Sequence, residues 1–199
     1  GELNGPREED EKRLAWLWHK KAFLYYSLID EPDCLDYWYG RHGHVRGNYY
    51  WRLGSVAPVL LRWIEWLHQH DPRHFTFIQI DNTCRPYNWM CYGLLADVCA
   101  THSYSLGRHG GLEEMYRWFA QMKQRAEPRP VYAVLQLCRV GARPEGRDAT
   151  YEEVAWQHYA ALATGMHGTI YYIHSGSRAM PRSREAWEKL AALHFELRQ

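Results

Sequence analysis

The chain has 199 residues, of which 46% are hydrophobic, so it is long enough to bury the core of one domain. Its 24 lysines and arginines nearly balance 23 aspartates and glutamates, and no block of like charge stands out. This balance argues against a protein dedicated to binding nucleic acid or a membrane surface. No apolar run approaches the roughly 18 residues that a membrane span requires.

The first half of the chain predicts two strands separated by helices. Residues 8–21 favour a helix, and the apolar run 23–29 is the first predicted strand. A helix with apolar residues at helical spacing ends near His70, before Asp71-Pro72. Residues 75–80 form the second predicted strand, which closes on Asp81.

The second half continues the same alternation. A short helix over 87–94 leads to a third strand over 97–101, and a helix over 112–125 leads to a fourth strand over 131–137. Thr150 and Glu153 form a capping box that opens the next helix, before a fifth strand over 168–173 and a last helix from Ser183. The residues predicted to face inward on these two helices are Ala155, Tyr159, Leu162 and Met166, then Trp187, Leu190 and Leu197.

The five strands read as apolar runs rather than as alternating patterns, which indicates a parallel α/β sheet covered on both faces. Two architectures remain: an open doubly wound sheet and part of a (β/α)8 TIM barrel. No Gly-x-Gly-x-x-Gly or Walker pattern follows any strand, which weakens the nucleotide-binding open sheet.

The first strand ends in Asp30-Glu31-Pro32-Asp33. Proline cannot donate to a strand ladder and biases the preceding residue away from helix, so the strand stops near Glu31. Carboxylates at the C-terminal ends of buried strands are where α/β-barrel enzymes hold their catalytic groups. The alternative interpretation is an acidic strand end that caps the next helix.

Several strand ends together resemble glycoside-hydrolase-like TIM barrels, in which an Asp-Glu-Pro often follows the fourth strand. The matching segments are Asp30-Glu31-Pro32, Ala96-Asp97-Val98 running into His102-Ser103-Tyr104, the strand ending in Leu135-Gln136, and residues 163–172. On this register the chain holds strands four to eight. The resemblance therefore implies a partial (β/α)8 barrel of five parallel strands, with residues 1–199 as a single α/β domain that is the C-terminal portion of a catalytic domain.

The resemblance also implies partners and a location. The resemblance implies a carbohydrate substrate, and barrels of this family are commonly exported from the cell. The open sheet edges would be covered by the missing N-terminal strands or by a homo-oligomer partner, because exposed strand edges invite pairing. A self-contained five-stranded sheet is the alternative.

By resemblance Glu31 takes the place of the general acid. Asp30 precedes it, and Asp81 is the first candidate for the second carboxylate, with Asp33 the next. The related barrels often place that carboxylate on the seventh strand, where this chain has Gln136 and no acid. Asp81 equally fits an Asx cap of the following turn. The missing acid favours a second hypothesis, a non-catalytic carbohydrate-binding or scaffold barrel.

Further candidates for substrate binding lie at the same strand ends. They are Asp33, Trp38, His102, Tyr104, Gln136 and Tyr172, with Trp89 as another ring that would stack on a sugar. For each aromatic side chain, packing in the fold is the stronger explanation.

No cofactor or metal is expected. The five cysteines contain no C-x-x-C pair, and the H-x-H motif His42-Gly43-His44 lies in a Gly/Arg-rich loop rather than at a strand end. A metal-dependent hydrolase is the third and weakest hypothesis.

Overall fold

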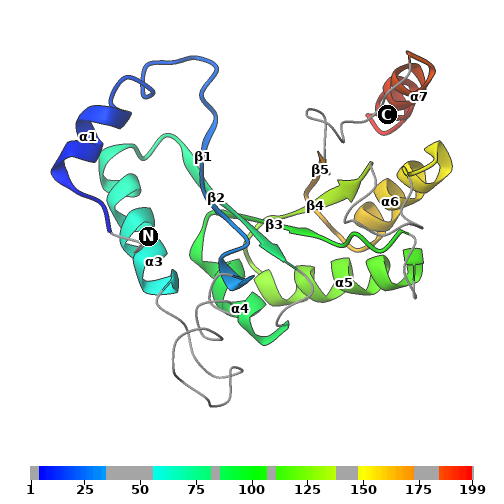
Figure 1. Cartoon of the computed structure of the whole chain (residues 1–199), viewed down its shortest axis with the longest axis horizontal. Coiled ribbons are helices and arrows are strands. Elements are labelled where there is room, and N and C mark those ends of the chain that lie inside the picture. The colour runs from blue at the N-terminus through cyan, green and yellow to red at the C-terminus, as the bar shows by residue number, and fades with distance from the viewer. Residues whose placement is uncertain are drawn as a thin grey trace. The chain divides into compact units, whose positions relative to one another are not determined.

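The structure is a computed structural model that describes residues 5–34, 56–81, 86–106, 111–137, 148–172 and 184–198. Trp38 and the His42-Gly43-His44 motif lie outside these ranges. Helices and strands alternate along the described chain (Figure 1). The elements are α1 (Glu8–Leu14), β1 (Tyr25–Asp30), α3 (Val56–His70), β2 (Phe75–Asp81), α4 (Pro86–Leu95), β3 (Val98–His102), α5 (Gly111–Ala126), β4 (Val131–Gln136), α6 (Tyr151–Ala163), β5 (Gly168–Tyr172) and α7 (Arg184–Glu196).

The five strands form a sheet in the order β1-β2-β3-β4-β5. The pairs β1–β2 and β4–β5 are parallel, with Tyr25 opposite Phe75 and Tyr132 opposite Gly168. A doubly wound sheet reverses its strand order at a switch point, whereas here each described strand is followed by its neighbour, as in a singly wound barrel. The prediction of five parallel strands that alternate with helices is confirmed.

Burial explains why these segments adopt this fold. All five residues of β3 are buried, as expected for a parallel strand covered on both faces. Helix α3 buries Val56, Leu60, Ile64 and Leu67, which recur every three or four residues and so form one apolar stripe. No described helix is long and apolar enough to cross a membrane.

The chain divides into two compact units, which we describe separately. Unit 1 comprises residues 1–100 and 125–131, and unit 2 comprises residues 101–124 and 132–199. The core of unit 1 contains Leu67, Ile78, Ile80 and Trp89. In unit 2, Leu137, Val154, Leu190 and Leu193 form a buried cluster that joins α6 and α7.

The predicted inward face of α6 is wrong for Tyr159 and Leu162, although Met166 is buried and Ala155 packs against the buried cluster. Tyr159 and Leu162 are 46% and 57% exposed, while Gln157 and His158 are buried. The two polar residues turn inward because each has a hydrogen-bond partner there, which apolar periodicity alone does not anticipate. On α7, Trp187 is likewise exposed rather than buried. Helix α1 ends at Leu14 instead of continuing to residue 21.

Candidate functional site

The end of β1 is irregular where the sequence places its carboxylates. Ser27 pairs with Phe77 but Asp30 pairs with Gln79, so β1 has one extra residue in a β-bulge. Glu31 follows with a φ of 51°, in the left-handed region that costs a non-glycine residue about 1–2 kcal/mol. Backbone strain of this kind is concentrated at functional sites. The bulge and the strained residue together set the direction of the Glu31 side chain.

Two backbone hydrogen bonds hold Glu31 in this conformation. Its N–H donates to the Gln79 carbonyl at 2.9 Å, and its own carbonyl accepts from the N–H of Cys34 at 3.0 Å. The first bond ties Glu31 to β2, and the second closes one turn over Pro32 and Asp33. Glu31 is therefore fixed between the two strand ends.

Glu31 lies beside Cys34 and Asp81. One carboxylate oxygen of Glu31, the sulfur of Cys34 and one carboxylate oxygen of Asp81 all lie within 4.8 Å of one another. The Cys34 thiol donates to Asp81 Oδ2 at 2.9 Å, and the indole N–H of Trp89 donates to the Asp81 carbonyl at 3.0 Å. Trp89 is fully buried, so its role here is to hold the end of β2 rather than to contact a ligand. We call Glu31, Cys34 and Asp81 the carboxylate–thiol cluster.

Asp33 supports this cluster from inside the fold. Its side chain is 0% exposed, and its Oδ1 accepts the backbone N–H of Asp81 at 3.1 Å. Its Oδ2 is buried without a hydrogen-bond partner among the described residues. Burial and, secondarily, the charge of Asp81 raise the pKa of Asp33 to about 7, against the opposing effect of backbone N–H groups. Asp33 is thus a carboxyl group that the fold keeps largely neutral below pH 7.

Asp30 lies on the exposed end of β1. Its Oδ1 accepts from Nε2 of Gln79 on the neighbouring strand at 2.9 Å. Unlike Glu31 and Asp81, it is not a member of the carboxylate–thiol cluster. Asp30 therefore remains a prediction as a catalytic group.

Unit 2 brings together three of the residues predicted to bind substrate. The rings of His102 and Tyr104 stack with centroids 4.4 Å apart, and Tyr104 lies 5.0 Å from Tyr172 in a tilted arrangement. His102 is buried, while Tyr104 and Tyr172 are half-buried. We call these three residues the aromatic platform.

Gln136 is also in unit 2 and is buried. Its side-chain Oε1 accepts from the N–H of Leu106 at 3.2 Å, so this atom already holds the segment that follows β3. The β4 end carries no carboxylate, which agrees with the departure from the family pattern noted in the sequence.

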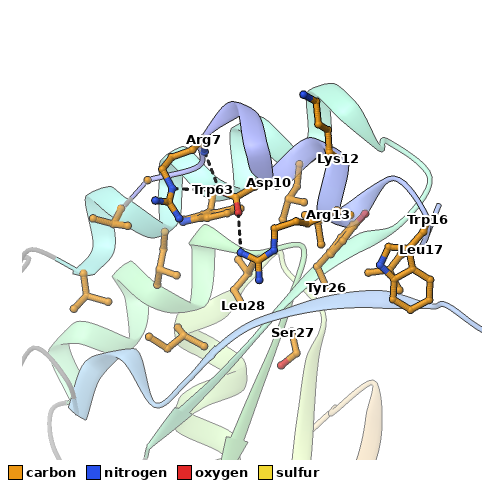
Figure 2. Close-up of a pocket in the computed structure, with 17 residues that line it drawn as sticks. Arg7, Asp10, Lys12, Arg13, Trp16, Leu17, Tyr26, Ser27, Leu28 and Trp63 are labelled. Carbon is orange, nitrogen blue, oxygen red and sulfur yellow. Dashed lines mark hydrogen bonds and ion pairs between the residues drawn. The ribbon is translucent and has the colours of Figure 1, made fainter. Parts of the chain in front are cut away.

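A separate cavity of about 1030 Å³ lies in unit 1 among α1, β1 and α3 (Figure 2). Its lining is mostly apolar, and Asp10 on its rim is paired with Arg7 and Arg13. None of the predicted site residues lines it. The cavity is therefore distinct from the carboxylate–thiol cluster.

Sequence reasoning missed Cys34 and the supporting role of Trp89. The available signal for Cys34 was its position three residues after Glu31, which is the spacing of one helical turn. Among the described residues, the carboxylate–thiol cluster is also the one group of His, Cys, Asp and Glu side chains gathered closely enough to hold a metal ion.

Comparison with known proteins supports the fold. No protein-family model and no curated protein sequence matches the chain. A crystal structure of a Bacteroides thetaiotaomicron protein, provisionally assigned as an alpha-L-fucosidase, is similar with a TM-score of 0.62 and 10% sequence identity. The match covers 94% of this chain and 60% of the other. At this identity the likeness shows only the α/β fold, and the chain spans about three-fifths of the similar protein's length.

Proposed function

We propose that the chain is part of a domain that hydrolyses glycosidic bonds, with Glu31 as proton donor and Asp81 as the second carboxylate. The observation that carries this proposal is the approach of the two side chains, whose oxygens lie within 4.8 Å at the ends of neighbouring parallel strands. Glycosidases use two such groups, one to protonate the leaving oxygen and one to stabilise or attack the sugar.

In this mechanism Glu31 donates its proton to the glycosidic oxygen as the bond to the anomeric carbon breaks. Asp81 then attacks that carbon, and water, deprotonated by Glu31, releases the sugar. The Cys34 thiol bonded to Asp81 Oδ2 orients that carboxylate, and Asp33 holds the backbone beneath it. Carboxyl groups about 5–5.5 Å apart are typical of retention of configuration. We therefore expect hydrolysis to retain the anomeric configuration.

We further propose that the aromatic platform of unit 2 binds a sugar. Half-buried tyrosine rings combine an apolar face with a hydroxyl, a combination suited to the face and edge of a sugar ring. Because the chain spans 60% of the similar structure, we further propose that it is the C-terminal portion of a larger catalytic domain. The remaining strands would come from elsewhere in the protein.

The experiment measures hydrolysis of 4-nitrophenyl α-L-fucopyranoside, chosen from the assignment of the similar structure, beside a panel of other aryl glycosides. It uses the full-length protein, with EDTA present. Glu31→Gln is expected to lower kcat/KM about 10²- to 10⁴-fold, the usual contribution of a positioned proton donor. Glu65→Gln on the exposed side of α3 is the matched control and should have no effect. Unchanged turnover in Glu31→Gln would overturn the assignment.

The second candidate function is a carbohydrate-binding domain without catalysis. It is favoured by the absence of an acid at the end of β4, where Gln136 instead bonds to Leu106. This candidate predicts saccharide binding that changes tyrosine or tryptophan fluorescence, with no hydrolysis of any glycoside in the panel.

A further inference from the structure

Helix α6 carries two consecutive polar residues that are almost completely buried, Gln157 and His158. Neither has a part in the proposed chemistry. A buried polar side chain is costly unless it is hydrogen-bonded, so its partners indicate what it does.

Gln157 pairs with the backbone of Gln136 at the end of β4. Its Oε1 accepts the Gln136 N–H at 2.7 Å, and its Nε2 donates to the Gln136 carbonyl at 3.0 Å. The residue after β4 is bonded differently, because the Leu137 N–H donates to the Tyr172 carbonyl on β5. In a parallel ladder, hydrogen bonds alternate between the two sides of a strand. Gln157 thus acts as a ladder partner for Gln136 on the side opposite β5.

Gln136, whose backbone is held by Gln157, in turn holds the segment after β3 through its side chain. Its side-chain Oε1 accepts the Leu106 N–H, and two residues before Leu106 lies Tyr104 of the aromatic platform. Within the same segment the hydroxyls of Ser103 and Ser105 are bonded at 2.6 Å and buried. The position of the Tyr104 ring therefore depends on Gln136, whose backbone depends on Gln157.

His158 holds the other side of the platform. Its Nε2 lies 2.6 Å from the hydroxyl of Tyr171, which is the residue before Tyr172 on β5. Successive strand residues point to opposite faces, so Tyr171 points toward α6 while Tyr172 points to the face of Tyr104. The same turn of α6 thus fixes both strands that carry or support the platform.

We infer that Gln157 is a positioning residue, which sets the contact between Tyr104 and Tyr172 through Gln136, with His158 holding β5 beside it. As a statement about ligand binding this inference rests on the proposed function, because the platform is where the sugar would stack. As a statement about ring positions it is independent of any ligand.

The experiment follows nuclear Overhauser effects between the ring protons of Tyr104 and Tyr172 in tyrosine-labelled protein. Gln157→Leu keeps the approximate shape but removes both hydrogen bonds, and we expect the ring-to-ring signal to be lost. Thr76→Val is the matched control, since Thr76 is equally buried and exchanges hydrogen bonds with Asp97 in unit 1. It should leave the signal unchanged. A wild-type ring signal in Gln157→Leu would overturn the inference.

Gln157→Glu decides the question if Gln157→Leu does not fold. A protonated carboxyl group reproduces the acceptor and the donor of the amide, whereas an ionised one cannot donate to the Gln136 carbonyl. The ring signal should therefore be present at low pH and disappear as this carboxyl ionises. A signal in Gln157→Glu that does not change with pH contradicts the inference.

L-fucose is the ligand probe, observed by its effect on the same tyrosine signals. Its Kd should rise about tenfold in Gln157→Leu, the scale of one lost aromatic contact, and not in Thr76→Val. An unchanged Kd with a lost ring signal would contradict the link to binding. Failure of the wild-type protein to bind L-fucose or any sugar of the panel counts against the proposed function, whereas the ring signals still decide the positioning.

Discussion

The strand ends of the two units carry opposite kinds of polar chemistry. In unit 1 the ends of β1 and β2 gather carboxyl groups and a thiol around a strained Glu31. In unit 2 the ends of β4 and β5 are held by the hydrogen-bonded amide of Gln157 and by the imidazole of His158, which bonds the hydroxyl of Tyr171. The first arrangement concentrates ionisable groups and strain, as reactive sites do, and the second provides rigid support.

Burial acts on both units by favouring neutral side chains, but the pKa moves in opposite directions. It raises the pKa of Asp33 to about 7 and, with the charge of His194, lowers the pKa of His158 to about 4. The titration of Asp33 should therefore lower the free energy of unfolding as pH rises. The titration of His158 should raise the free energy of unfolding as pH rises. Between pH 4 and 6.5 the two effects oppose each other in the wild-type protein.

The largest expected effect on stability is that of Asp33→Asn. Folded Asp33 holds its proton up to about pH 7, whereas the unfolded carboxyl loses it near 3.8, so the free energy of unfolding falls as pH rises through this window. Over the whole window the loss is about 4 kcal/mol, at about 1.4 kcal/mol per pKa unit. Asp33→Asn should be close to wild type at pH 4 and more stable at pH 8 in urea unfolding. A variant less stable than wild type at pH 8 would contradict the claim that ionisation of Asp33 destabilises the folded state.

His158→Gln tests the other half. Between pH 6.5 and about 4, His158 is protonated in the unfolded state but neutral in the folded state. The free energy of unfolding therefore falls as pH is lowered. The expected loss is about 3 kcal/mol on the same scale. Glutamine does not titrate but keeps a hydrogen bond to Tyr171, so the variant should lose less stability than wild type between pH 7.5 and 4.5. His68→Gln, at a partly exposed position of α3, is the control. If the free energy of unfolding changes equally with pH in His158→Gln and in wild type, the pH dependence does not come from His158.

A smaller effect is expected from Thr150→Ala at the start of α6. Thr150 Oγ1 accepts the Glu153 N–H at 3.3 Å, and Glu153 accepts the Thr150 N–H at 2.8 Å. Loss of the threonine side of this capping box should cost about 1 kcal/mol. Amide exchange should show faster opening of α6 with no change in α3. Equal acceleration in both helices would mean that the two units open together and are not separate in stability.

Local sequence rules predicted much of the fold and the proximity of two carboxylate side chains. The apolar runs located all five strands, the Thr150–Glu153 pattern located the start of α6, and Pro32 located the end of β1. The proximity of Glu31 and Asp81 also followed, because the C-terminal ends of neighbouring parallel strands meet at one edge of the sheet.

The remaining features depend on tertiary hydrogen bonds that no local pattern encodes. Gln157 and His158 point inward because Gln136 and Tyr171 are there to bond them, and Tyr159 and Leu162 are exposed as a result. The thiol of Cys34 likewise has its hydrogen-bond partner, Asp81, only because β2 lies beside β1 in the folded chain. Such pairs join residues 13 to 47 positions apart, beyond the reach of periodicity.

The most direct measurement of the central claim is the dependence of the Glu31→Gln defect on the leaving group. A proton donor matters for a basic leaving group and hardly for one that departs as a stable anion. We expect a loss in kcat/KM of about 10²-fold or more for 4-methoxyphenyl α-L-fucoside and little loss for the 2,4-dinitrophenyl glycoside. Equal losses on both substrates, or none on either, would contradict the assignment of Glu31 as the proton donor.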